Sequence, residues 1–340
     1  MQIKVILNKI YSYIKWMKIL WHPFGKTAYL LATPTHDNIG DLAIVVAEEK
    51  FLKYCGYDRI INIVMSDCWE YPKCIARLIP HNSPVYFNGG GNMGDIYLDE
   101  QLRRTLLPLL KKHEVVLFPQ TIFYRNTVEG NEKKASSIQY YNQKNITIAA
   151  REEKSFQIMK NLYPEATILL TPDIVLSMEV QNFGKERNGI LLCFRDDQEK
   201  SVSNESIDEL QRCLETKGYS IEKTSMIYYR HITAGMWGHA VRGKMEQIAS
   251  ARLFITDRLH GMIFAALTQT PCIVFGNNHH KVSGVYKWID TLDYISLVSS
   301  VNEAIMLADK MYNSKDCKFQ FNMGLFDEFK KMIQEKGGLD

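Results

Sequence analysis

Hydrophobic and polar positions follow two alternating patterns along most of this chain. Short apolar runs are typical of buried strands, and longer stretches with apolar residues at helical spacing separate them. In the first half the predicted strands are Ala28–Ala32, Ile60–Met65, Val85–Phe87, Val115–Phe118 and Ile146–Ala150. The predicted helices between them are Leu42–Tyr54, Tyr97–Lys112 and Glu152–Leu162. Short buried strands joined by helices predict a parallel sheet with helices on both faces.

The second half repeats this alternation after a polar segment, residues 181–188, which is typical of a linker. Its predicted strands are Gly189–Phe194, Tyr219–Ile221, Leu253–Thr256 and Pro271–Phe275. Its predicted helices are Ile207–Thr216, Lys244–Ala251, Met262–Leu267, Val301–Tyr312 and Leu325–Gln334. We therefore predict an α/β protein with two doubly wound domains, residues 23–180 and 189–316, that face each other across a cleft. A C-terminal helix follows within residues 317–340.

The first 22 residues have a pattern of their own. Apolar side chains make one stripe at helical spacing: Ile3, Ile6, Leu7, Ile10, Ile14, Met17 and Trp21. Lysines lie beside this stripe, which predicts an amphipathic helix over residues 1–22. A basic amphipathic helix can lie on an anionic membrane surface, or it can dock on the protein's own core, and the pattern leaves both alternatives open.

Charge and cysteine usage narrow the class of protein. The formal net charge of +3 over 340 residues suits an anionic small substrate or a membrane surface and lacks the concentrated basic signature of a nucleic-acid binder. The seven cysteines are scattered and form no C-x-x-C pair, which favours a reducing compartment over a disulfide framework or a cysteine-built metal site. We see neither a signal peptide nor an apolar run of the ~20 residues that span a bilayer. The expected location is the cytoplasm, with the inner face of the cell membrane as an alternative through residues 1–21.

A polar motif, His36-Asp37-Asn38-Ile39-Gly40-Asp41, joins the first predicted strand to the first long helix. Loops at the carboxyl ends of strands are where open parallel sheets bind ligands. Gly40 would let a ligand approach the backbone, and Asp41 could act on a substrate hydroxyl. The alternative is a turn and helix cap without chemistry.

A glycine-rich segment, Asn88–Asp95, follows the third predicted strand. It matches G-x-G-x-x-G at Gly89, Gly91 and Gly94, but the next strand ends in Pro119-Gln120 where the dinucleotide fingerprint expects an acid. The segment suits a polar ligand such as a sugar better than a pyrophosphate. The alternative is a structural turn.

Arg151 stands where a strand ends and a helix begins, within Ala149-Ala150-Arg151-Glu152. A guanidinium at a helix start can bind a carboxylate or a phosphate. A salt bridge to Glu152 or Asp173 explains the same residue equally well.

The most specific motif is Thr256-Asp257-Arg258-Leu259-His260-Gly261, between a predicted strand and an apolar helix. It brings a carboxylate, an anion clamp and a proton donor to one strand-to-helix corner. Packing alone does not require three ionisable groups there, because burying them unpaired is costly. Residues 276–281, which include His279, His280 and Lys281, follow the next strand at the same edge of the sheet. They lack H-E-x-x-H spacing and predict anion-facing or solvent-exposed groups rather than a metal site.

These motifs, together with Pro119-Gln120 and Thr171-Pro172-Asp173, occur in the order and approximate spacing of the polysaccharide pyruvyl transferase family, which residues 28–290 resemble. The resemblance implies two Rossmann-like domains of the GT-B kind. It also implies phosphoenolpyruvate as the donor and neither metal nor cofactor. It implies that Arg258 and His260, with Arg151 as a further candidate, meet the phosphate and carboxylate of the donor.

The expected reaction transfers a pyruvyl group to a sugar of a polysaccharide or of a lipid-linked oligosaccharide precursor, with ketal formation and phosphate release. We expect His260 to act as the general acid and Asp257 to orient it or to balance Arg258. Asp41, or alternatively Asp95, would accept the hydroxyl proton. The expected substrate-binding residues are Arg258, Arg151, Leu259, Gly261, Lys281, Asn38, Gly40, Gly90, Gly91, Asn92, Asp95 and Gln120. The alternatives are a GT-B glycosyltransferase that uses a sugar nucleotide and a non-catalytic sugar-binding protein.

Overall fold

The computed structural model describes residues 13–14, 16–17, 25–197, 200–228, 233–276, 280–315 and 317–339. Its contacts divide the chain into two compact units. The first comprises the chain up to Thr35, residues 47–174 and the chain from Gly324 onward, and the second comprises residues 36–46 and 175–323. This division differs from the predicted boundaries at residues 36–46, at residues 175–188 and 317–323, which belong to the second unit, and at the C-terminal helix, which belongs to the first. The predicted cleft between the two domains stays a prediction.

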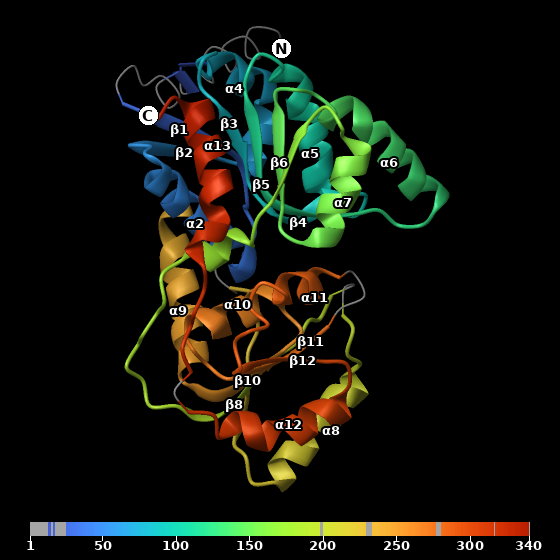
Figure 1. Cartoon of the computed structure of the whole chain (residues 1–340), viewed down its shortest axis with the longest axis vertical. Helices are drawn as coiled ribbons and strands as arrows, with labels where there is room; N and C mark the ends of the chain where they lie inside the picture. Colours follow the sequence, from blue (N-terminus) through green and yellow to red (C-terminus); the bar gives the residue numbers. More distant parts are fainter. Residues whose placement is uncertain are drawn as a thin grey trace, which may run out of the picture. The chain divides into compact units, whose positions relative to one another are not determined.

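The first unit is built on a parallel sheet in the order β2-β1-β3-β5-β6-β7, with β4 also paired to β5. Its strands are β1 (Thr27–Thr33), β2 (Arg59–Val64), β3 (Val85–Phe87), β4 (Gly90–Gly94), β5 (Val115–Phe123), β6 (Ile146–Ala150) and β7 (Thr167–Leu170). Its helices are the part of α2 (Ile39–Cys55) from Ala47 onward, α3 (Met65–Glu70), α4 (Pro72–Leu78), α5 (Leu98–Leu106), α6 (Val128–Tyr141), α7 (Glu153–Leu162) and α13 (Asp327–Gly337). The central strands β1, β5 and β6 are buried along nearly their whole length, so both faces of the sheet are covered (Figure 1).

The expected glycine-rich loop is in fact strand β4. Gly94 has a φ of +132°, and a Cβ there would lie 1.8 Å from the backbone oxygen of Phe123. Glycine is therefore needed for β4 to approach β5. The prediction of a ligand-binding loop is therefore corrected: this segment is a strand, and its glycine allows two strands of the sheet to approach closely.

The second unit has a parallel sheet in the order β12-β11-β10-β8-β9. Its strands are β8 (Asn188–Cys193), β9 (Ile221–Lys223), β10 (Ala251–Thr256), β11 (Cys272–Phe275) and β12 (Ile295–Val298). Its helices are α8 (Asn204–Thr216), α9 (Trp237–Ala249), α10 (Leu259–Leu267), α11 (Lys281–Tyr286) and α12 (Val301–Tyr312). Helices α8 and α12 pack together on one face of this sheet, and α9 and α10 cover the other face (Figure 1).

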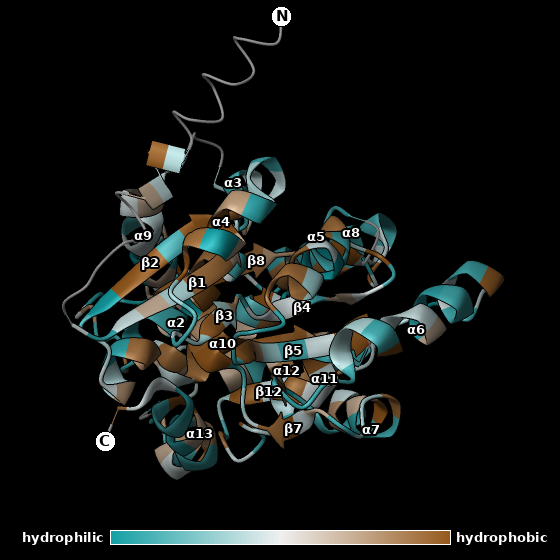
Figure 2. Ribbon diagram, turned by 90° about the horizontal axis from the view of Figure 1, so that it is seen from above, coloured by the Kyte–Doolittle hydropathy of each residue, from teal (hydrophilic) through white to brown (hydrophobic). Residues whose placement is uncertain are grey.

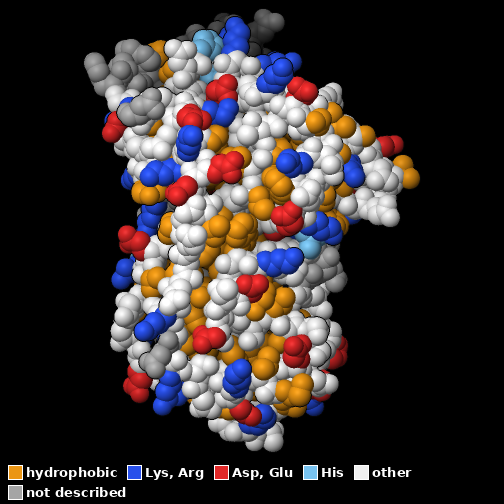
Figure 3. All heavy atoms as spheres, viewed as in Figure 1, with side chains coloured by type: hydrophobic (Ala, Val, Ile, Leu, Met, Phe, Trp, Pro, Cys, Tyr) orange, Lys and Arg blue, Asp and Glu red, His pale blue; other side chains and the backbone are white. Residues whose placement is uncertain are grey.

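Hydropathy follows this layering within each unit. Helix α10 is apolar and almost entirely buried, whereas α13 is largely hydrophilic on its outer face (Figure 2). Charged side chains of both signs are interspersed over the face in Figure 3, in keeping with the small net charge. Two parallel-sheet α/β units confirm the predicted fold class.

Helix α13 matches the predicted C-terminal helix and packs on the first unit. Phe329 stacks on Phe51 with ring centroids 5.7 Å apart and meets Phe118 edge-on at 5.4 Å. The chain end therefore completes the core of the unit in which the chain begins.

Most of the predicted helix over residues 1–22 lies outside the described residues. Trp16 is buried in the first unit beside Tyr71, whereas Ile14 and Met17 of the predicted stripe are exposed. Among the described residues of this segment, the side chain that docks on the core is thus not one of the stripe, and membrane contact through the stripe stays a prediction. Within the described ranges, no helix combines the length and hydrophobicity needed to cross a bilayer.

Candidate active site

The carboxyl edge of the second sheet gathers the most specific motif. At the end of β10, the Thr256 hydroxyl donates to the Cys193 carbonyl of neighbouring β8 at 2.7 Å and accepts from the Arg258 amide at 3.0 Å. These two bonds fix the corner between β10 and α10. Leu259 and Gly261 lie buried in the first turn of α10 and pack against this corner.

Asp257 is a buried carboxylate at this corner. One of its oxygens accepts from the Arg195 amide at 2.9 Å, and the other, Oδ2, has no hydrogen-bond partner among the described residues. Burial raises the pKa of Asp257 to about 6, against the lowering effect of the Arg195 amide and of the Arg258 and Arg195 charges. A carboxyl group with this pKa changes its charge close to neutral pH.

Arg258 caps α10 and is nearly buried as well. Its Nη1 donates to Asp197 Oδ2 at 3.2 Å, and its Nε has no hydrogen-bond partner among the described residues. The amides of the first turn of α10 face the same corner, and a helix N-terminus favours an anion. A guanidinium with unused donor capacity beside such a terminus suits a phosphate or a carboxylate.

His260 lies against the polar motif that follows β1. A methyl group at Gly40 would lie only 2.5 Å from His260 Nδ1, so glycine is needed at this position. The motif is tied to the second unit because the Ile39 amide donates to the Met226 carbonyl at 2.8 Å, and the Tyr228 amide donates to the Asp37 carbonyl at 2.8 Å. Sequence order assigns this loop to the first domain, but these backbone bonds place it with the second unit.

Asn38 and Asp41 complete this loop. The Asn38 side-chain oxygen accepts from the Gly40 amide at 3.0 Å, and Asp41 lies in the first turn of α2, 3.6 Å from the His36 ring. The structure therefore brings the predicted acid, His260, and the neighbourhood of one predicted base, Asp41, into one unit.

The other predicted residues at the first sheet are engaged within the first unit. Arg151 is buried and forms an ion pair with Asp173 at 2.7 Å, and its Nε donates to the Thr121 hydroxyl at 2.8 Å. Glu152 caps α7 by accepting from the Ser155 amide. The salt bridge anticipated as the alternative is thus present, and donor binding by Arg151 stays a prediction.

The glycine-rich strand is held in the same way. The buried Asp95 accepts from the Arg125 amide at 3.0 Å and pairs with its guanidinium at 2.7 Å. Asn92 accepts from Arg103 at 2.8 Å, while Gly90 and Gly91 form the start of β4. These contacts stabilise the sheet edge, and a ligand role for these residues stays a prediction.

A neutral polar cluster lies behind this edge. Gln120 donates to the Asn88 carbonyl at 2.8 Å, and the Gly89 amide donates to the fully buried Glu48 carboxyl at 2.7 Å. Burial raises the pKa of Glu48 well above its usual range. Glu48 was not among the predicted residues, although its spacing from Val45 and Leu52 places it on the buried stripe of α2.

Lys281, Arg195 and Asp197 also lie at the carboxyl edge of the second sheet. Lys281 is buried at the start of α11, and His279 lies outside the described residues. Arg195 and Asp197, which the sequence analysis missed, follow β8 at this edge. Their position directly after an apolar strand, like that of Asp257, is the signal that could have revealed them.

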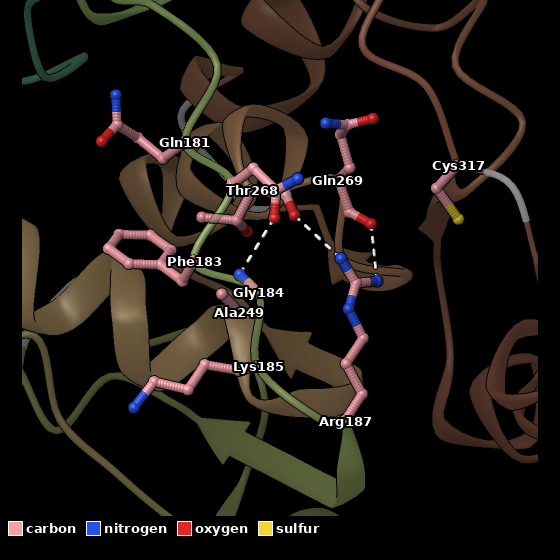
Figure 4. Close-up of a pocket in the computed structure, with 10 residues that line it drawn as sticks. Gln181, Phe183, Gly184, Lys185, Arg187, Ala249, Thr268, Gln269 and Cys317 are labelled. Atoms are coloured by element: carbon pink, nitrogen blue, oxygen red, sulfur yellow. Dashed lines mark hydrogen bonds between the residues drawn. The ribbon is translucent and has the colours of Figure 1, made fainter.

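A pocket of about 180 Å³ opens at the amino edge of the second sheet, away from these residues (Figure 4). Arg187, just before β8, donates to the carbonyls of Gln269 and Thr268 at 2.7 and 2.9 Å. The pocket is lined by Gln181, Asn182, Phe183, Gly184, Lys185, Arg187, Ala249, Thr268, Gln269 and Cys317. The predicted site residues lie elsewhere.

Comparison with solved structures bears on the fold. The UDP-N-acetylglucosamine 2-epimerase from Rickettsia bellii aligns with a TM-score of 0.52 at 9% identity, over 92% of this chain and 96% of that chain. This likeness shows a GT-B-like fold.

Comparison with known sequences bears on the family. General stress protein 30 of Bacillus subtilis (strain 168) is 34% identical over 301 residues, which cover 85% of this chain and 86% of that protein. Pyruvyl transferase 1 of Schizosaccharomyces pombe is 29% identical over 326 residues, which cover 88% of this chain and 79% of that protein. A sequence model of the polysaccharide pyruvyl transferase family matches residues 38–279, which span the motifs from Asn38 to His260. The chain is therefore an enzyme of pyruvyl transfer to polysaccharide and belongs to the polysaccharide pyruvyl transferase family.

Proposed function

We propose that this enzyme transfers the pyruvyl group of phosphoenolpyruvate to two hydroxyls of one sugar, with formation of a ketal and release of phosphate. The sugar belongs to a polysaccharide or to its lipid-linked precursor. The observation that carries the proposal is the corner at the end of β10, where buried polar atoms of Asp257 and Arg258 lack hydrogen-bond partners among the described residues. Buried charged groups with unused hydrogen-bonding capacity are costly unless a ligand completes them.

Phosphoenolpyruvate suits this corner by its charge. It carries a phosphate and a carboxylate on one small frame, so its site needs cationic groups that can bind two anionic ends. Arg258 offers a planar donor fork, and the first turn of α10 offers amides beside it. Lys281 and Arg151 remain candidates for the other end of the donor.

The chemistry balances with the groups at hand. Protonation of the donor's methylene carbon by His260 makes the central carbon electrophilic, and a sugar hydroxyl then adds to it while Asp41 accepts the hydroxyl proton. The bond from this carbon to the phosphate oxygen then breaks, and a second hydroxyl closes the ketal. Of the two hydroxyl protons, one replaces that delivered to the methyl group and the other leaves with phosphate. The reaction needs no oxidant or reductant, and we propose that it uses no cofactor.

The acceptor is the less constrained partner. Family membership supports a polysaccharide acceptor. A lipid-linked precursor at the inner membrane face would give a role to the lysine-flanked stripe of residues 1–21, which could bind anionic lipid reversibly. Ile14 and Met17 of this stripe are exposed in the structure, which supports this role.

Phosphate release tests the proposal. The purified protein is incubated with phosphoenolpyruvate and a panel of soluble and lipid-linked sugars, and free phosphate is followed over time. We expect release that requires both donor and acceptor. Nucleotide release from a sugar nucleotide, without phosphate release from phosphoenolpyruvate, would instead support a GT-B glycosyltransferase.

A further inference from the structure

One carboxylate joins two arginines at the carboxyl edge of the second sheet. Asp197 Oδ2 accepts from Arg195 Nη2 at 3.1 Å and from Arg258 Nη1 at 3.2 Å, and Asp197 Oδ1 accepts from Arg195 Nε at 2.8 Å. The two guanidiniums come from different strand ends, since Arg195 follows β8 and Arg258 follows β10. Both guanidiniums bind one carboxylate oxygen, so the two arginines form an anion-binding site that the Asp197 side chain occupies.

Exposure distinguishes the three side chains. Those of Arg195 and Arg258 are 15% and 10% exposed, whereas that of Asp197 is 46% exposed. The guanidiniums are therefore held by the body of the unit, and the Arg195 backbone is further fixed by its bond to Asp257. The carboxylate can return to water at small cost, because half-exposed ion pairs contribute little to stability.

We propose that Arg195 and Arg258 together form the binding site for one anionic group of the donor, and that Asp197 occupies this site until the donor displaces it. This inference rests on the proposed function for the identity of the donor. Arg195 becomes a second donor-binding residue, and Asp197 becomes an internal competitor that lowers the affinity of the empty enzyme for anions. Two nearby guanidiniums without a bridging carboxylate repel each other, and a phosphate or carboxylate relieves that repulsion.

Substitution of Asp197 separates this role from a structural one. In the Asp197→Asn variant the side chain keeps its size and loses its charge, so the competitor is removed. We expect phosphoenolpyruvate and inorganic phosphate each to bind about three- to tenfold tighter by calorimetry. The Arg195→Gln variant should bind phosphoenolpyruvate and inorganic phosphate at least about tenfold more weakly than the native enzyme, since a charge-assisted contact is lost. In the Arg195→Gln background, Asp197→Asn should tighten binding less than it does in the native enzyme.

Asp309 offers a matched control. It is an exposed aspartate of the second unit, paired with Lys217 at 2.7 Å near the end of α12, and Asp309→Asn changes the net charge equally. We expect this variant to bind phosphoenolpyruvate and phosphate as the native enzyme does. Thermal unfolding of each variant verifies that the fold is kept.

The two probes separate the two proposals. Tighter phosphate binding in Asp197→Asn without any phosphoenolpyruvate binding would support the two-arginine site and contradict phosphoenolpyruvate as the donor. Unchanged or weaker binding of both probes in a folded Asp197→Asn variant would overturn the competitor role of Asp197. Unchanged donor affinity in Arg195→Gln would remove Arg195 from the site.

Discussion

The carboxyl edges of the two sheets both pair arginines with acids, but they differ in whether charged atoms are left buried without a hydrogen-bond partner among the described residues. In the first unit, the arginines and acids at the strand ends pair with each other, as Arg151 does with Asp173 and Arg125 with Asp95. In the second unit, Asp257 Oδ2 and Arg258 Nε are buried without a hydrogen-bond partner among the described residues. A strand-end arginine in a parallel α/β sheet is thus weak evidence for a ligand site until its partners are known.

The unsatisfied atoms of the first edge are of a different chemical kind. They include the side-chain oxygens of Asn88 and Gln120 and the second oxygen of Glu48, whose raised pKa favours its neutral form. Neutral buried groups of this kind are commonly completed by ordered water. At the second edge, Arg258 Nε is a cationic donor that an anion can satisfy, which is why we place phosphoenolpyruvate there.

The largest expected effect sharpens the contrast at the second edge. His260→Ala should keep the fold and most of the donor affinity but lose about 10²–10⁴ in rate, the usual contribution of positioned proton transfer. Single-turnover rates beside calorimetric donor binding measure the two effects separately. If the variant loses donor affinity and not rate, His260 binds the donor and another group supplies the proton.

The next prediction concerns the first edge. Arg151→Met leaves the buried Asp173 carboxylate without its cation, and we expect the unfolding free energy to fall by about 3–5 kcal/mol. Denaturant unfolding measures this loss, and Lys217→Met, which breaks the exposed ion pair with Asp309, serves as a milder control. A stable Arg151→Met variant that fails to bind phosphoenolpyruvate would break the comparison, because Arg151 would then act on the donor.

Asp257 gives the comparison a pH dependence. Its folded pKa of about 6 lies above the unfolded value, so folding favours the protonated carboxyl. Its contribution to stability is full below the unfolded pKa and is lost as pH rises through about 6. Asp257→Asn does not titrate, and its unfolding free energy relative to the native enzyme should rise by about 2–3 kcal/mol between about pH 4 and pH 7. A constant difference across this range would contradict the raised pKa.

The sequence predicted the sheets better than their long-range contacts. Apolar runs identified the buried strands β1, β3, β5, β6, β8, β10 and β11, because such strands are hydrophobic on both faces. Strand β4 was not predicted, because its glycines are typical of turns. Residues 36–41 were predicted to belong to the first domain, because the backbone bonds to Met226 and Tyr228 join segments far apart in the chain.

The candidate site shows the same limit. Position after a strand identified Asp257, Arg258 and His260 correctly as neighbours at one corner. The same rule selected Arg151 and Asp95, because spacing along the chain cannot tell which cation already has a buried carboxylate as its partner. That distinction required the three-dimensional contacts.

Donor affinity of the Arg258→Lys variant tests the central claim most directly. The lysine keeps the charge but replaces a planar fork with a single ammonium group, so it cannot reproduce a bidentate contact. We predict that phosphoenolpyruvate binds about 10- to 100-fold more weakly by calorimetry, while the thermal unfolding temperature stays near that of the native enzyme. A folded Arg258→Lys variant with native donor affinity would contradict the assignment of the donor to this corner.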